Sequence, residues 1–311
     1  MYHLNLTFPL EDYDEFYKAA PGSYISNLLG QRGPGSLLSF LKKKSLAHHI
    51  VASHKRFYQA RFSLMMITIQ LTDHGERHVD NIIKTVFQYI NMLKKNLPNK
   101  AYYEELKLLT EQQFEMKERE KAVTVAELLA HSLHCYDPVD VLTGDYLISE
   151  WRPDLITRIL ADLHPNNLRV TVLSKNAKYL ETKVEAHYGT EFHIDRIPED
   201  MISQWRNAGT NPEFSLPQPN PLISTVPSLI RPPTNTRQPE LLMFLDRIRT
   251  RAWFMADQRF LVPKTYVYLK FCSPHAYRSP RECNLNNLLV YTIRDHLVEF
   301  KYTAVVAGEL G

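Results

Sequence analysis

The sequence predicts an α+β fold: one complete α/β sandwich-like domain, in which helices pack on a mixed sheet, followed by the start of a second domain. The first residues alternate between apolar and polar, with Leu4, Leu6 and Phe8 on one face, which is the period of a half-buried strand. Residues 62–71 show the same alternation, whereas residues 79–93 repeat their apolar side chains at the spacing of an amphipathic helix. Strands and helices therefore both belong to the first part of the chain.

The other elements of this part can be predicted in chain order. Pro9 is expected to stop the first strand, because proline cannot donate a hydrogen bond to a strand ladder. Two short helices separated by a glycine-rich loop are expected next, and a short strand follows them. The predicted ranges are 21–30 and 35–45 for these helices, 50–53 for the strand, 102–133 and 153–163 for later helices, and 168–173 for a later strand.

A proline-rich stretch divides the chain. Eight of the nineteen prolines fall between residues 212 and 239, a density that disfavours helix and favours an extended connector. We therefore expect a first domain over residues 1–212, a linker over 213–239 and the truncated start of another domain over 240–311.

The last part of the chain contains three weaker patterns. Residues 242–254 are mixed, residues 264–272 alternate like a strand, and residues 284–306 repeat like a helix. Because a strand begins at residue 2 and a helix ends near residue 306, both ends resemble cuts within a longer protein.

Composition and charge exclude several classes of protein. Hydrophobic residues make up 44% and charged residues 23%, which is ordinary for a globular protein and excludes a disordered or fibrous chain. The formal net charge is only +3, so no nucleic-acid partner is expected. No apolar run approaches the roughly 20 residues that cross a bilayer, so no membrane partner is expected. Three cysteines without a C-x-x-C pair, and the absence of a secretory signal, favour the cytosol.

The run His74-Gly75-Glu76-Arg77-His78 is the first candidate for a metal site. Its histidines lie four residues apart, but the glutamate is central, at neither place that H-E-x-x-H or H-x-x-E-H requires. We interpret the run as a solvated helix start. No metal ligand, cofactor-binding residue or catalytic residue is assigned to this chain.

His131 and His134, followed by Cys135, form a second candidate. Apolar residues recur around them, so core packing is the expected role. Cys135, Cys272 and Cys283 are all expected to be small buried hydrophobic residues.

The end of the first predicted helix suggests a binding role. A helix that ends at Gly30 presents unpaired carbonyl groups and the negative end of its dipole to the following loop. The amino terminus of a peptide would be favoured there, and a nearby edge strand would add the peptide backbone by β-augmentation. A purely structural role stays open at this point, with Gly30 as a helix cap and Gly33-Pro34-Gly35 as a turn.

Six short segments together resemble the middle of the pitrilysin-type inverted-zincin metallopeptidases. They follow the order and spacing of that family over essentially the whole chain. The segments are Leu6-Thr7-Phe8-Pro9, Gly33-Pro34-Gly35-Ser36-Leu37-Leu38-Ser39, Phe87-Gln88-Tyr89-Ile90, Trp151-Arg152-Pro153-Asp154-Leu155-Ile156, Tyr188-Gly189-Thr190 and Ser273-Pro274-His275-Ala276-Tyr277. The resemblance implies that residues 1–212 are the second of four homologous α+β domains and that the third begins near residue 240.

The resemblance also bears on activity. The zinc site of the family, an H-x-x-E-H motif with a later glutamate, belongs to the first domain, and this sequence contains no H-x-x-E-H. We therefore expect a peptide-binding middle portion of a zinc metalloendopeptidase that degrades small peptides. Zinc belongs to the full-length family member, and this chain alone is expected to be inactive. Two alternatives stay open: a non-catalytic module that dimerises with or regulates a full-length homologue, and a fragment without a function of its own.

The second domain of the family carries an exosite that anchors the amino terminus of the substrate. The resemblance places this site at Asn27, Gly30, Ile50, Ala52 and His54. The family strand is glycine-rich where this chain has Ala52-Ser53, and Arg32 replaces an acidic residue of the loop. A positive side chain there opposes binding of a protonated amine, so the resemblance implies an altered exosite.

Overall fold

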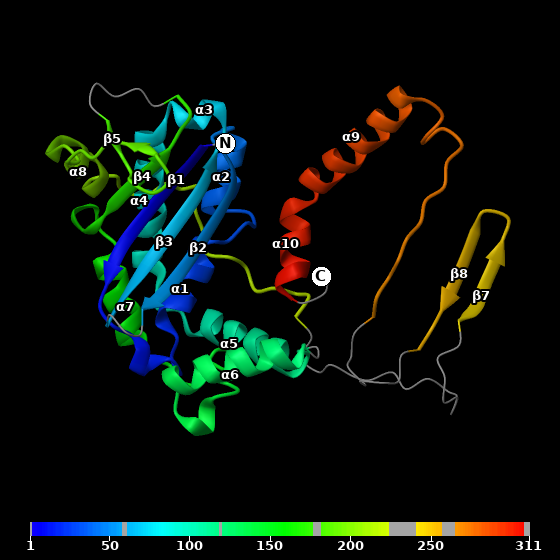
Figure 1. Ribbon diagram of the computed structural model, residues 1–311, viewed down its shortest axis with the longest axis horizontal. Coiled ribbons are helices and arrows are strands. Elements are labelled where there is room, and N and C mark those ends of the chain that lie inside the picture. The colour runs from blue at the N-terminus through cyan, green and yellow to red at the C-terminus, as the bar shows by residue number, and fades with distance from the viewer. Residues whose placement is uncertain are drawn as a thin grey trace.

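The computed structural model describes residues 2–57, 61–117, 120–176, 182–223, 241–256 and 265–307. Its main sheet has four strands in the order β2-β3-β1-β4 (Figure 1). The strands are β1 (Tyr2–Leu10), β2 (Ala47–Phe57), β3 (Phe62–Leu71) and β4 (Arg169–Leu173). The α+β class is confirmed, but every neighbouring pair in this sheet is antiparallel, whereas the sequence predicts a mixed sheet. Because β3 lies between β2 and β1, β2 forms one edge of the sheet.

The alternation in β1 and β3 sets which face of the sheet is covered. Leu4, Leu6 and Phe8 are fully buried, as the sequence predicts. Their partners across the ladder are Ile69, Ile67 and Met65, which are also fully buried. One face of the sheet is therefore continuous hydrophobic core.

Four helices cover this face, as Figure 1 shows: α1 (Pro21–Leu29), α2 (Leu37–Lys43), α4 (Val79–Asn96) and α7 (Pro153–Asp162). Phe87 of α4 joins the layers, because its ring centroid lies 6.2 Å from that of Phe8 and 6.2 Å from that of Trp205. One buried cluster extends from Leu4 in β1 to Phe214.

The remaining helices and strands are shorter or come later in the chain. They are α3 (Asp73–Glu76), α5 (Lys100–Glu115), α6 (Ala122–Cys135), α8 (Glu199–Arg206), the pair β5 (Lys183–Val184) and β6 (Glu191–Phe192), the hairpin β7 (Leu242–Arg247) and β8 (Thr250–Phe254), α9 (Pro280–His296) and α10 (Val298–Val306). Short 3-10 helices lie at Asp14–Phe16, Pro138–Asp140 and Pro165–Asn167. Near the start of α10, Glu299 accepts a hydrogen bond from the Ser39 hydroxyl at 2.7 Å, so α10 contacts α2.

Pro9 lies inside β1 instead of ending it. Its carbonyl oxygen accepts a hydrogen bond from Asn167 Nδ2 at 2.8 Å, on the side of the strand where β4 lies. The backbone nitrogen of a strand residue points to the same side as its carbonyl, and β4 pairs only with residues 3–7 of β1. The missing N–H of Pro9 therefore interrupts no ladder.

Several later predictions about elements need correction. The range 102–133 is two helices, α5 and α6, and the range 284–306 is divided between α9 and α10 at Leu297. Residues 265–272 form no strand, since no described strand pairs with them. Alternation alone predicted that strand, whereas a strand also needs a hydrogen-bonded neighbour. Residues 213–223 of the predicted linker contain neither helix nor strand, and residues 224–239 of it lie outside the described ranges.

The predicted burial of the histidines and cysteines is also wrong. His131 and His134 are exposed on α6, in which only Ser132 is buried. All three cysteines are free, and Cys272 is exposed while Cys135 and Cys283 are half-buried. Apolar spacing indicates a helix face, but that face is buried only where another layer packs on it.

Candidate functional site

Four of the five predicted site residues surround one small cavity at the edge of the main sheet. The end of α1 lies beside β2, so Asn27 and Gly30 of the helix end meet Ile50 and Ala52 of the strand. The cavity has a volume of about 180 Å³, and its other lining residues are Ser26, Arg32, Val51 and Tyr302. Consecutive strand residues point to opposite faces. Because Ile50, Val51 and Ala52 all line the cavity, it lies against the backbone edge of β2.

A side chain at Gly30 is restricted by close contact and not by its backbone angles. Its φ of −88° and ψ of 2° are open to any residue. A Cβ atom at this position would lie 3.3 Å from the Ser26 carbonyl oxygen and 3.6 Å from the backbone nitrogen of Ala52. The Gly30 N–H also donates to the Ser26 carbonyl at 2.9 Å. Gly30 therefore caps α1 and borders the cavity at the same time.

The carbonyl groups at the end of α1 are only partly satisfied. The Leu28 carbonyl accepts from the Tyr89 hydroxyl at 3.0 Å and from the Gln31 N–H at 3.4 Å. Among the described residues, no donor reaches the carbonyl oxygens of Asn27 and Gly30. Free carbonyls at a helix end carry the partial negative charge that favours a bound cation.

Tyr89 supports this helix end, and removing its hydroxyl group tests that support. Tyr89→Phe is expected to lower the free energy of unfolding by about 1 kcal/mol, because the buried Leu28 carbonyl loses a donor. The ring itself should keep its packing against Phe214, at 5.2 Å between centroids. Urea denaturation measures the difference. Tyr188→Phe, on a side chain that is 90% exposed, is the matched control, and equal losses in the two variants would contradict the assignment.

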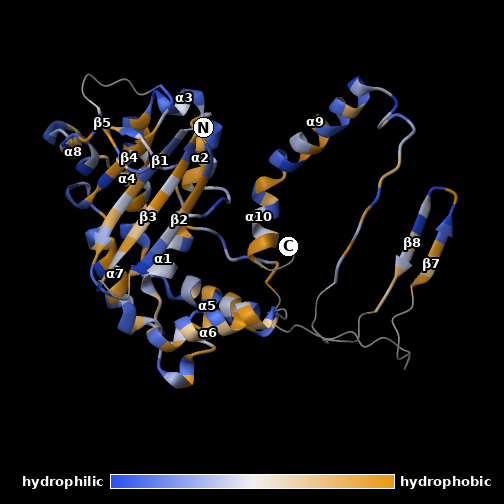
Figure 2. Cartoon of the chain, in the orientation of Figure 1, coloured by the Kyte–Doolittle hydropathy of each residue, from blue (hydrophilic) through white to orange (hydrophobic). Residues whose placement is uncertain are grey.

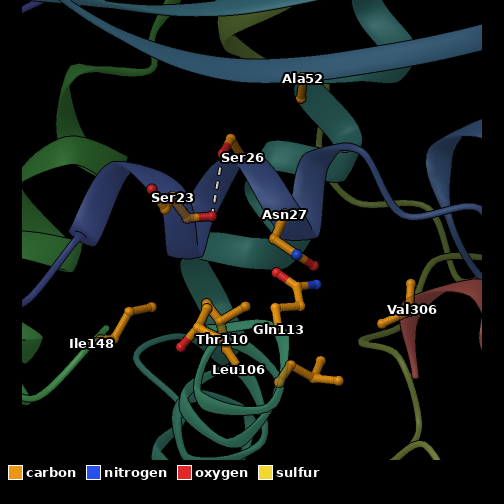
Figure 3. Close-up of a pocket in the computed structure, with 10 residues that line it drawn as sticks. Ser23, Ser26, Asn27, Ala52, Leu106, Thr110, Gln113, Ile148 and Val306 are labelled. Atoms are coloured by element: carbon orange, nitrogen blue, oxygen red, sulfur yellow. Dashed lines mark hydrogen bonds between the residues drawn. The ribbon is translucent and has the colours of Figure 1, made fainter. Parts of the chain in front are cut away.

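A second, larger cavity adjoins the first (Figure 3). Its volume is about 350 Å³, and it shares Ser26, Asn27 and Ala52 with the smaller cavity. Its further lining residues are Ser23, Leu106, Leu109, Thr110, Gln113, Ile148 and Val306. Figure 3 shows the side chains of Asn27 and Gln113 pointing toward one another.

Sequence reasoning missed the contribution of α5 to this region. Leu106, Leu109, Thr110 and Gln113 recur at i, i+3, i+4 and i+7, which places them on one face of α5. That spacing is visible in the sequence. What the spacing does not reveal is that this face meets α1.

The Asn27 side chain is held by its neighbours. Its Oδ1 atom accepts a hydrogen bond from the Tyr102 hydroxyl at 2.6 Å and one from Gln31 Nε2 at 3.5 Å. Burial raises the pKa of Tyr102 well above its ordinary value, so the hydroxyl keeps its proton. Asn27 is therefore a fixed part of the wall between the two cavities.

His54, the fifth predicted residue, lines neither cavity. Its ring lies in the core-side layer, 6.4 Å from the Tyr13 ring between centroids, and a Cβ on Gly22 would lie 2.2 Å from its Nδ1 atom. Burial, aided by the charge of Arg56, lowers the pKa of His54 to about 4, so the ring is neutral at pH 7. Within the described part of the chain, its Nε2 atom is buried without a hydrogen-bond partner.

Arg32 brings a positive charge to the smaller cavity. Its guanidinium carbon lies 5.7 Å from the centre of the Tyr302 ring, and its Nη2 atom lies 3.4 Å from His49 Nε2. Burial, followed by the charges of Arg32 and Lys42, lowers the pKa of His49. The cavity therefore combines carbonyl dipoles with one full positive charge.

The run from His74 to His78 does not form one helix face. α3 ends at Glu76, so His78 lies beyond the helix that contains His74. The rings of His74 and His78 are 4.3 Å apart between centroids. The Glu76 carboxylate accepts hydrogen bonds from the Ser174 hydroxyl and from Asn176 Nδ2. Over the described ranges, no three His, Cys, Asp or Glu side chains gather as a metal site would require.

None of the described helices has the length and apolar character that a membrane span needs.

Comparison with known proteins identifies relatives for almost the whole chain. A family model described as "Peptidase M16 inactive domain" matches residues 2–109, and one described as "Middle or third domain of peptidase_M16" matches residues 114–309. The chain is 36% identical to the insulin-degrading enzyme of Homo sapiens over 294 residues, and 31% identical to the nardilysin of Homo sapiens over 310 residues. It is 32% identical to the A-factor-processing enzyme of Saccharomyces cerevisiae over 306 residues.

These alignments cover most of this chain but a minor part of each relative. They include 94% of the chain and 29% of the insulin-degrading enzyme, 98% and 27% of nardilysin, and 98% and 29% of the A-factor-processing enzyme. The crystal structure of pitrilysin superposes with a TM-score of 0.77 at 21% identity, over 98% of this chain and 32% of that chain. The structural match supports the fold, and the sequence matches support the family.

Proposed function

Because the chain belongs to the peptidase M16 family, we propose that it forms the peptide-binding portion of an insulysin-like zinc metalloendopeptidase that degrades small peptides. The cavity between the end of α1 and the backbone edge of β2 is the observation that carries this proposal. A peptide would add to the edge of β2 as a further strand, with its protonated amino terminus beside the free carbonyls of α1.

Each predicted site residue then has a definite part in binding. Gly30 leaves room for the peptide, and Asn27 forms the fixed wall of the cavity. Ile50 and Ala52 contribute their backbone groups, because the Ile50 side chain is fully buried. His54 acts indirectly, since its neutral ring projects from β2 toward Gly22 at the start of α1 and holds the strand beside the helix.

The zinc implied by the family does not fit the described residues. They hold no cluster of three candidate ligands, and the sequence has no H-x-x-E-H motif. We therefore assign peptide binding and no hydrolytic step to this chain, and we place the zinc ligands of the proposed enzyme outside it. A cytosolic location stays a prediction.

The proposed domain division keeps residues 1–212 together, with a linker over 213–239 and the start of another domain over 240–311. The buried cluster that extends from Leu4 to Phe214 supports the first boundary. The pairing of β4 with β1 also supports it, because residues far apart in sequence share one sheet.

Blocking the cavity tests the proposed binding site. Gly30→Leu is expected to weaken binding of a fluorescent peptide by about tenfold or more, because the new side chain fills the space between α1 and β2. Fluorescence anisotropy with a peptide labelled at its carboxyl end measures this change. Acetylation of the amino terminus should also weaken binding, since it removes the positive charge.

Gly33→Leu is the matched control for Gly30→Leu. A Cβ at Gly33 meets no atom within 4 Å, and this glycine lies in the same loop without lining the cavity. Normal binding by the Gly33 variant and loss in the Gly30 variant are expected. Equal affinity in both variants would overturn the proposed site.

A second function, as an interaction module for a homologous subunit, rests on α9. Figure 2 shows apolar residues along this helix, and Leu285, Leu288 and Leu289 are 54%, 61% and 57% exposed. Contiguous exposed apolar residues indicate a surface that another segment or subunit covers. Sedimentation velocity of the chain over a concentration series tests this, because a monomer at all concentrations would contradict self-association.

A further inference from the structure

We propose that the smaller cavity binds peptides that carry a carboxylate close to their amino terminus, and that the Arg32 guanidinium is the group that recognises it. The inference rests on the proposed peptide-binding function and adds the chemical class of the preferred peptide. It follows from the positive charge of Arg32, which lines the cavity and would by itself repel the protonated amino terminus of a peptide.

Arg32 is held at the cavity by two neighbours. Its guanidinium carbon lies over the Tyr302 ring, 5.7 Å from the ring centre, and its Nη2 atom lies 3.4 Å from His49 Nε2. A guanidinium group over an aromatic ring can still donate hydrogen bonds through its N–H groups. The same side chain lines the cavity together with Asn27 and Gly30.

Apart from the contact of Nη2 with His49 Nε2, Arg32 makes no side-chain hydrogen bond within the described part of the chain. Its Nε atom is buried and has no hydrogen-bond partner there. None of the ion pairs between described residues includes Arg32. A buried donor without a partner is costly, and the planar fork of a guanidinium group matches a carboxylate with two parallel hydrogen bonds. A ligand carboxylate in the cavity would supply the missing countercharge and accept hydrogen bonds from the guanidinium group.

The two charges of the site then have complementary roles. The free carbonyls at the end of α1 favour the ammonium group of the peptide. Arg32 would oppose that ammonium group if it stood alone, but a nearby ligand carboxylate neutralises the guanidinium group. A peptide with an acidic residue at its first or second position satisfies both groups at once.

Two peptides that differ at one position test the inference on the unmodified chain. They have the same length and a carboxyl-terminal fluorophore, with Glu at the second position of one and Gln at that of the other. The Glu peptide is expected to bind about tenfold more tightly at low salt, the factor that one charge-assisted hydrogen bond supplies. Arg32→Gln should remove the preference, and Arg32→Glu should favour a third peptide with Lys at that position.

The outcomes separate this inference from the proposed function. Equal affinity for the Glu and Gln peptides on the unmodified chain would overturn the inference and leave the peptide-binding proposal standing. No binding of any peptide would overturn the proposed function and the inference with it. A Glu preference that persists in a folded Arg32→Gln variant would also overturn the inference, because another group would then be responsible.

Discussion

Replacing Gly75 with alanine is expected to lower the free energy of unfolding by about 3 kcal/mol, at the upper end of what overpacking costs. A Cβ on Gly75 would lie 1.9 Å from the Leu46 carbonyl oxygen, which is far inside van der Waals contact. That oxygen accepts a hydrogen bond from the Thr72 N–H at 3.1 Å. Because the obstructing atom belongs to the backbone, no side-chain rotation relieves the overlap.

The position of this contact makes the effect large. Leu46 directly precedes β2, and Thr72 directly follows β3. The Thr72 side chain also accepts from the Gly75 N–H at 2.8 Å and donates to the Ser45 carbonyl at 2.7 Å. Moving α3 away would therefore disturb the paired ends of the two strands and the start of the edge strand.

Urea denaturation of Gly75→Ala beside Gly33→Ala measures this cost. Gly33 is the matched control because a Cβ there meets nothing within 4 Å. A near-wild-type free energy of unfolding is expected for the Gly33 variant. If both variants unfold at the same urea concentration, the close packing of α3 against Leu46 is refuted.

Acidification from pH 7 to pH 4 is expected to remove about 3 kcal/mol of stability through His54 alone. The pKa of this imidazole is lowered from 6.5 to about 4 in the folded chain, chiefly by burial. Between these values the unfolded chain binds a proton that the folded chain excludes. The contribution of His54 is therefore complete above pH 6.5, and it is lost as the pH falls toward 4.

The comparison of wild type with His54→Gln isolates this residue from other groups that titrate in the same range. Urea unfolding at pH 7 and at pH 4 should show a smaller loss of stability in the variant. A wild-type loss that the variant reproduces in full would show that His54 does not titrate as proposed. Because His54 lies in β2, peptide binding at the edge of this strand should weaken over the same pH range.

The spacing of apolar residues along the sequence correctly predicts those strands and helices that bury one face against the core. The alternation of residues 62–71 agrees with β3, and the apolar repeat from Val79 agrees with α4. The same reasoning failed for residues 265–272 and for His131, because alternation or helical spacing says which residues share a face and not what covers that face. The break between α5 and α6 also escaped it, since both halves are helical in pattern.

The candidate site also combines residues that the sequence predicts with residues that only the fold reveals. Gly30, Ile50 and Ala52 were predicted from a helix end and a resemblance, and the fold brings them together around one cavity. His54 is predicted in the same group and shares the strand face of Ile50 and Ala52, but it lies farther along β2, beside Gly22 at the start of α1. Tyr302 of α10 lines the same cavity as Ala52, although it follows Ala52 by 250 residues in the sequence.

The sequence by itself determined the α+β class, the main strands and helices, and the family, because these depend on periodicity and on residue order along the chain. Only the tertiary structure decided that β2 is an edge strand, that α5 and Tyr302 complete the cavities, and that Arg32 stands there without a carboxylate among the described residues. The physical reason is that burial, pairing and charge balance belong to contacts between distant segments. No single segment carries that information.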